Sequence, residues 1–173
     1  MARSIPAYLL LWLVLILAQV LICNHILLFG VAMPAIFLLI ILRLPISMSL
    51  SLALTISFLT GATVDLFSDS AGVNAMSCCV VAMLRRPIFY LFMNHDEESE
   101  TITPSVGSMG AWKYIRYEVT SVLLFFIISM SIVFFNYVHI SDLAIRILSS
   151  TILTSLIILG IDSIFVGKNE NKG

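Results

Sequence analysis

The sequence predicts an all-α integral membrane protein, in which a single domain forms a polytopic bundle of six transmembrane helices. Three observations support this fold class. The chain is 60% hydrophobic and only 11% charged, whereas a soluble domain has about 25% charged residues. Its apolar residues gather in runs close to the roughly 20 residues that cross a bilayer as a helix. Eight of its nine Lys and Arg residues fall on the same side when those runs are placed in a membrane.

The predicted spans belong to one domain, residues 1–173, and cover residues 5–23, 26–42, 46–64, 70–84, 119–138 and 143–166. The first span contains Gln19 near its end. It is longer than the apolar core of a typical signal peptide, and no small-residue cleavage pattern precedes the second span. We therefore expect it to stay in the protein as a helix.

The second span contains a proline, Pro34, and ends at Arg43 and Pro45. Proline cannot donate a backbone hydrogen bond, so we expect a kink at this position. In lipid, the carbonyl that loses its donor needs a partner from elsewhere in the protein. The third span begins directly after Pro45.

The fourth span is short, because its apolar core covers only residues 71–84. We expect that it either thins the bilayer or has an irregular start shielded by other helices. Residues 87–93 (PIFYLFM) are predicted to lie at the membrane interface. Residues 94–110 are acidic, rich in Ser and Thr and interrupted by Pro and Gly. This composition predicts a solvated cytoplasmic linker.

The fifth span follows residues 111–118 (AWKYIRYE), whose aromatic and cationic side chains are typical of the headgroup level. The sixth span begins beyond Ser141 and Asp142, whose oxygens suit the free N–H groups at a helix start. Asp162 lies about 6 Å inside the end of this span by helical rise. Acids inside a membrane are often functional, but this one is also close enough to the edge to be wetted.

The cations set the orientation of the bundle. With the N-terminus in the cytoplasm, the inner segments hold eight Lys and Arg residues and the outer turns hold only Arg146. Both termini are therefore predicted to be cytoplasmic. Asp65 and Asp69 then lie at the outer face, between the third and fourth spans.

Small side chains recur every four residues along the third span and end in an acid: Ser49, Ala53, Ser57, Gly61 and Asp65. Such a ridge lets the backbone of another helix approach closely in lipid. We refer to these five residues as the small-residue ridge, and we expect it to bind a neighbouring helix.

Asp65 has two interpretations. It is either a polar residue that simply ends the third span or a fixed corner held by the next helix, with the Ser68 hydroxyl and the N–H groups that open the fourth span as its donors. Asp69 or Ser70 is predicted to cap the fourth span.

The sequence shows no pattern typical of catalysis or of ligand binding. No Ser/His/Asp set, zinc-ligand spacing, phosphate-binding loop or pair of intramembrane carboxylates stands out. No basic patch with interleaved aromatics suggests nucleic acid. The three cysteines are expected to be small apolar fillers. We therefore predict a non-catalytic protein without a cofactor or a metal.

The motif G-x-x-x-D-x-x-S-x-x-x-G-x-x-A in this chain resembles one in the rod shape-determining protein MreD family. An early glutamine, a proline in the second span, the length, the number of spans and the orientation are also similar. The residues that carry the resemblance are Gly61, Asp65, Ser68, Gly72 and Ala75, together with Gln19 and Pro34. The long acidic linker after the fourth span departs from the family pattern.

The resemblance implies a scaffold of the cell-elongation machinery, which synthesises peptidoglycan and sets rod shape, in the bacterial inner (cytoplasmic) membrane. Members of this family associate with the membrane-anchored protein MreC. Through MreC they reach RodA, its transpeptidase partner and, indirectly, MreB filaments. The resemblance also implies a fold similar to the substrate-binding subunits of energy-coupling-factor transporters. The small-residue ridge is then expected to bind the transmembrane helix of a partner within the lipid bilayer.

An alternative function rests on the fold analogy. The chain would be a small-molecule or lipid-binding membrane subunit of a transporter, and its pocket would lie around residues 65–74. A membrane enzyme is a third and more distant alternative, because the charges are single and spread along the chain.

Overall fold

The computed structural model describes most of the chain, and its regular secondary structure there is helical. The described residues are 5–23, 33–68, 70–93, 103–133 and 140–170, with side chains described over 12–21, 33–68, 70–93, 103–133 and 140–163. The elements in this part of the chain are α1 (Ile5–Ala18), the π-helical turn η1 (Gln19–Cys23), α2 (Leu38–Leu42), α3 (Leu50–Ser68), α4 (Val73–Phe92), α5 (Val106–Met109), α6 (Ala111–Val133) and α7 (Ile140–Glu170). The predicted all-helical class is confirmed over these residues.

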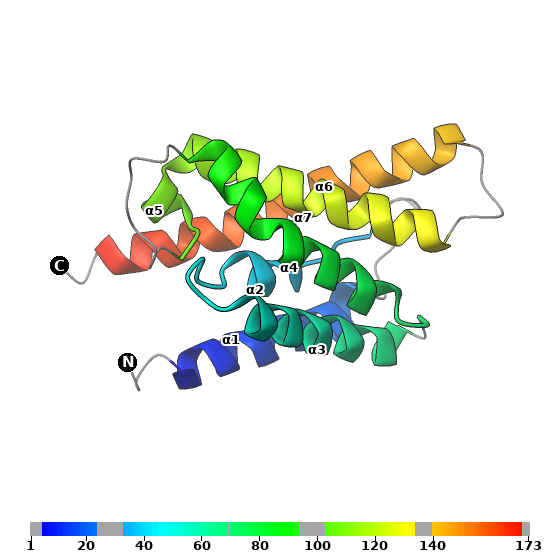
Figure 1. Cartoon of the computed structure of the whole chain (residues 1–173), viewed down its shortest axis with the longest axis horizontal. Helices are drawn as coiled ribbons and strands as arrows, with labels where there is room; N and C mark the ends of the chain where they lie inside the picture. Colours follow the sequence, from blue (N-terminus) through cyan, green and yellow to red (C-terminus); the bar gives the residue numbers. More distant parts are fainter. Residues whose placement is uncertain (1–4, 24–32, 69, 94–102, 134–139, 171–173) are drawn as a thin grey trace.

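Four of the described helices are long and apolar enough to cross a membrane: α3, α4, α6 and Ile140–Ser163 of α7. By length and composition they support the predicted class of membrane protein. In Figure 1, α3 and α4 run antiparallel, as do α6 and α7, and the start of α1 lies at the same end of the molecule as the end of α7. The structure does not reproduce six full helical spans in the described residues, and the predicted span that is broken there is the second.

The first predicted span, residues 5–23, is continuously helical from α1 through η1. The apolar part of it with described side chains, Trp12–Leu21, is shorter than a full span. The indole N–H of Trp12 donates to the Thr60 hydroxyl at 2.9 Å. This hydrogen bond fixes the first helix against α3.

The prediction of a helix over residues 26–42 is confirmed for the five residues of α2 and wrong for residues 33–37. Residues 24–32 lie outside the described chain. Residues 33–35 have no regular structure, and a turn leads into α2. Pro34 explains the break, since proline lacks an N–H and disfavours helix in the residue before it. Pro45 stands shortly beyond the other end, so α2 stays short.

The fourth span is longer than predicted, because α4 continues through Pro87 to Phe92. The expected interfacial segment 87–93 is therefore the end of this helix for all but its last residue. Phe89 is buried there, and its packing holds the turns after Pro87 in place. The third span also shifts, since α3 begins at Leu50 and ends at Ser68.

Residues 111–118 form the first two turns of α6, which begins at Ala111. Tyr114 and Tyr117 are fully buried in the core, so these two rings face the bundle and not the surrounding lipid. Trp112 does stay exposed, and the Arg116 guanidinium lies 5.0 Å from the centre of its ring. The spacing of four residues between Trp112 and Arg116 allows this contact.

The predicted linker 94–110 is folded in its described part. Residues 94–102 lie outside the described chain. Ser105 caps α5, since its hydroxyl accepts a hydrogen bond from the Ser108 N–H at 3.2 Å. Met109 is buried in the core. The end of this segment is therefore part of the bundle and not a solvated linker.

The centre of the bundle is the short helix α2. Leu38, Leu39, Ile41 and Leu42 are all buried, and Phe37 makes an edge-to-face contact with Phe125 of α6. A helix that is apolar on every side is stable only when other elements surround it. In Figure 1, α2 lies in the middle of the molecule among the long helices.

Candidate functional site

Asp65 connects the end of α3 to the start of α4. Its Oδ1 atom accepts hydrogen bonds from the Ser70 hydroxyl, from the Asn74 backbone N–H at 3.0 Å and from the Asn74 side-chain amide at 2.9 Å. Its Oδ2 atom accepts one from the Ala75 N–H at 2.8 Å. A carboxylate at the first free N–H groups of a helix is favoured by both hydrogen bonding and the helix dipole. Asp65 therefore caps α4 from the preceding helix.

The interpretation of Asp65 as a fixed corner is confirmed for the N–H donors that open the fourth span. The predicted role of Ser68 is wrong, because its hydroxyl donates to the Val64 carbonyl at 2.8 Å within α3. Ser70 supplies the hydroxyl instead. The prediction that Ser70 caps the fourth span is also wrong, since the residue at the helix boundary is Gly72. Asp69, the other predicted cap, lies outside the described residues.

Gly72 and Gly61 have different reasons to be glycine. Gly72 has a φ of 80°, which side chains other than glycine rarely adopt. A Cβ atom added to Gly61 would lie 2.5 Å from the Ala75 Cα and 2.7 Å from the Asn74 carbonyl oxygen. The backbones of α3 and α4 thus touch at Gly61, one helical turn before Asp65. Most residues of the motif that carries the resemblance therefore take part in joining α3 to α4.

The small-residue ridge is covered by this chain itself. Ala53, Ser57, Gly61 and Asp65 are buried, and α4 lies directly against Gly61. Ser49 is exposed and precedes the helix. The expectation that the ridge offers a free surface to a partner is therefore wrong. The ridge permits a close contact as predicted, but α4 has small residues of its own and occupies it.

An open groove lies beside this corner, on a different face of the same two helices. Its volume is about 780 Å³. The lining is apolar apart from the turn at one end, and it consists of Phe58, Ala62, Asp65, Leu66, Ser70, Ala71, Gly72, Ala75, Met76 and Cys79. We refer to it as the α3–α4 groove. Several of the large residues that line it are exposed, Leu66 among them.

Gln19 and Pro34, which the sequence singled out separately, meet in the structure. The Gln19 side-chain amide donates to the Pro34 carbonyl at 2.9 Å, and its oxygen accepts from the Ile36 N–H at 2.9 Å. Gln19 begins the π-helical turn η1. Widened turns of this kind are often found at functional sites within helices. The expected protein neighbour at Pro34 is thus confirmed, whereas the carbonyl that loses its donor, that of residue 30, lies outside the described residues.

Two hydroxyls on α7 complete the support of this irregular segment. The Ser150 hydroxyl accepts a hydrogen bond from the Met33 N–H, and the Thr154 hydroxyl accepts one from the Ala35 N–H, both at 3.1 Å. Irregular backbone is tolerated inside a membrane only where protein groups satisfy it. The segment before α2 meets this condition, because η1 and α7 lie on either side of it and supply the partners.

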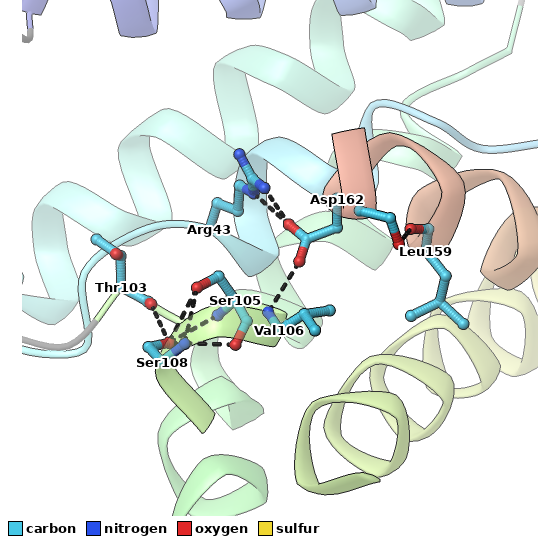
Figure 2. Close-up of polar contacts among 8 residues, drawn as sticks. Arg43, Thr103, Ser105, Val106, Ser108, Leu159 and Asp162 are labelled. Atoms are coloured by element: carbon cyan, nitrogen blue, oxygen red, sulfur yellow. Dashed lines mark hydrogen bonds and ion pairs between the residues drawn. The ribbon is translucent and has the colours of Figure 1, made fainter. Parts of the chain in front are cut away.

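Asp162 is held inside the bundle rather than wetted at its edge. Its side chain is 0% exposed, and it forms an ion pair with Arg43. The Nε atom of Arg43 donates to Oδ1 at 2.9 Å, and the backbone N–H of Val106 donates to Oδ2 at 2.8 Å. Figure 2 shows Arg43 and Val106 approaching the carboxylate from two sides. Asp162 thus connects α7 to the end of α2 and to the start of α5.

Arg85 and Arg86, which served only as orientation signals in the sequence, bind the loop between α2 and α3. Arg85 is 1% exposed and donates to the carbonyls of Leu44 and Pro45, both at 2.8 Å. Arg86 donates to the carbonyls of Ile46 and Met48 at 3.1 and 2.8 Å. These carbonyls can accept hydrogen bonds from the arginines because Pro45 prevents the loop from forming a helix. In the sequence, the contact could have been predicted from this proline and from two adjacent arginines that have no acid nearby.

These sites hold the chain to itself, and no three His, Cys, Asp or Glu residues gather among the described residues. Comparison with models of known families, with curated proteins and with solved structures finds no match to this chain. The resemblance to the MreD family therefore stays a prediction from the residues named above.

Proposed function

We propose that this chain is a non-catalytic scaffold of the bacterial inner membrane that binds the transmembrane helix of a partner in the α3–α4 groove. The observation that carries the proposal is the groove itself, which is apolar, open and fixed at one end by the Asp65 corner. Ala62, Ala75 and Gly72 in its lining let a foreign backbone approach closely. Phe58 and Met76, both exposed, are the large side chains available to pack against that partner.

The resemblance to the MreD family suggests the identity of the partner. It favours the single membrane helix of MreC, and through MreC an association with RodA, its transpeptidase partner and MreB filaments. The Asp65 corner supports this proposal, because three residues of the family motif, Asp65, Gly72 and Ala75, line the groove. In this arrangement both termini are cytoplasmic and the Asp65 corner is at the outer face.

Filling the groove tests the proposal. Ala62→Trp places a large side chain in the groove, so we expect co-purification of MreC from the same bacterium to fall about tenfold or more, equivalent to about 1.4 kcal/mol. Rod shape should be lost as well in a complementation assay. The thermal stability of the purified variant should stay near that of the wild type, since the added ring lies in an open groove.

Ile152→Trp is the matched control, because Ile152 is exposed on α7, away from the groove. It should retain both the partner and rod shape. If Ala62→Trp bound MreC as well as Ile152→Trp does, the proposed docking site would be wrong. If the wild type instead retained a phospholipid or a small molecule in native mass spectrometry, and Ala62→Trp lost it without losing MreC, the lipid- or ligand-binding alternative would replace the proposal.

A further inference from the structure

Glu118 is a buried carboxylate whose oxygen atoms make no hydrogen bond. The residue is 0% exposed, and neither Oε1 nor Oε2 has a partner among the described residues. It lies about 10 Å into α6 by helical rise, in a helix that is long and apolar enough to cross a membrane. An ionised carboxylate without water or a partner is strongly unfavourable in such a place. Something must therefore compensate its charge.

Two hydroxyl groups on the same pair of helices, α6 and α7, are also buried and without a hydrogen bond. Tyr114 precedes Glu118 by one helical turn on the same face of α6, and its hydroxyl makes no hydrogen bond. Ser155 on α7 interacts with the Glu118 carboxylate, yet its hydroxyl has no hydrogen bond of ordinary geometry. Figure 1 shows α6 and α7 side by side and antiparallel. The Glu118 carboxylate on α6 and the Ser155 hydroxyl on α7 are thus neighbours that are both left without a hydrogen bond of ordinary geometry.

The charged groups nearby are already engaged with other partners. Asp162 on α7 is the neighbouring charge that acts on Glu118, and it is itself negative and paired with Arg43. Arg85 on α4 lies near Tyr117 and gives its hydrogen bonds to the loop before α3. The helix α5 carries no charged side chain. In the described part of the chain, no cation donates a hydrogen bond to either oxygen of Glu118.

We propose that Glu118 binds one positive charge, a proton or a small monovalent cation such as Na⁺, with the hydroxyl of Ser155 completing the site. A proton turns the carboxylate into a neutral acid that donates a hydrogen bond to the Ser155 oxygen. A cation instead takes the carboxylate and hydroxyl oxygens as ligands. Either ligand removes the uncompensated charge and satisfies the orphaned oxygens. This site is independent of the α3–α4 groove and does not rest on partner binding.

Infrared spectroscopy of the purified full-length protein distinguishes the two ligands. With choline as the only added cation at neutral pH, a bound proton gives the C=O stretch of a carboxylic acid, which is absent from Glu118→Gln. A bound Na⁺ gives no acid band, but Na⁺ then raises the melting temperature of the wild type and not that of Glu118→Gln. Asp142→Asn is the control, because Asp142 is exposed in the first turn of α7, and it should behave as the wild type does.

An ionised carboxylate in choline, combined with a melting temperature that Na⁺ does not change, would overturn the proposal. If Glu118→Gln fails to fold, the wild type still decides the matter, since isotopic labelling of the glutamate carboxyl carbons shifts the acid band of a protonated Glu118. Ser155→Ala keeps the carboxyl and removes its neighbour. It should shift that band if Ser155 is the hydrogen-bond partner, or weaken the Na⁺ effect if Ser155 is a ligand.

Discussion

At the scale of single residues, Asp65 shows why an acid can sit without a cation at the end of a membrane helix. Its two oxygens take four hydrogen bonds from the turn and from the first N–H groups of α4. We predict that Asp65→Asn is milder than Asp65→Leu. Asparagine keeps one acceptor oxygen and leaves one buried N–H without a partner, which lowers the free energy of unfolding by about 1–3 kcal/mol. Leucine leaves all of these donors without an acceptor and lowers the free energy of unfolding by on the order of 4 kcal/mol.

Unfolding in mixed detergent micelles measures both variants against the wild type. Asp142→Asn is the control, and as an exposed substitution it should change the free energy of unfolding by no more than about 0.5 kcal/mol. Equal losses for Asp65→Asn and Asp65→Leu would show that the corner needs the charge rather than an acceptor.

At the scale of helices, the closest contact is between α3 and α4 at Gly61. The Cβ atom of Gly61→Ala would lie within 2.7 Å of the backbone of Asn74 and Ala75, so the two helices must move apart. We predict a loss of about 1–3 kcal/mol in the free energy of unfolding, as is typical of overpacking. This loss should appear although alanine forms helices better than glycine by about 1 kcal/mol.

Gly160→Ala on α7 separates the two effects, because a Cβ atom there meets nothing within 4 Å. It should be neutral or stabilising by up to about 1 kcal/mol. If Gly61→Ala were as stable as Gly160→Ala in the same unfolding assay, the contact between α3 and α4 would be looser than the structure has it.

At the scale of the whole molecule, Asp162 connects parts of the chain that are far apart in sequence (Figure 2). Arg43, Val106 and Asp162 come from the end of α2, from α5 and from α7. We predict that Asp162→Leu or Arg43→Met alone lowers the free energy of unfolding by about 3–5 kcal/mol, because each breaks an ion pair whose carboxylate is fully buried. The double variant should lose less stability than the sum of the two single losses, and the difference should be a coupling energy of about 1–3 kcal/mol.

A double-mutant cycle in the same unfolding assay measures this coupling. The control cycle pairs Asp142→Asn with Arg146→Gln. These residues are one turn apart near the start of α7, and such surface pairs contribute no more than about 0.5 kcal/mol. Additive losses at Arg43 and Asp162 would mean that the pair does not hold the three segments together.

The sequence by itself determined the features that depend on local composition. Apolar runs gave the all-helical membrane class and the existence of the long helices, because any helix that crosses lipid must satisfy its own backbone and be apolar over its length. The Asp65 corner could also be predicted from the sequence, because the free N–H groups of the following helix lie only a few residues further along the chain. Gln19 and Pro34 stood out for the same kind of reason, as a polar residue and a proline inside apolar runs.

Only the tertiary structure decided which surfaces meet. The broken second span is stable because Gln19, Ser150 and Thr154 reach its backbone, and that depends on the packing of η1 and α7 around it. The small-residue ridge is buried because α4 folds onto it. The environments of Glu118 and Asp162 follow from the contact between α6 and α7. In lipid, exposed and buried helix faces are equally apolar, so hydropathy alone cannot tell a surface that binds the chain's own helices from one left for a partner.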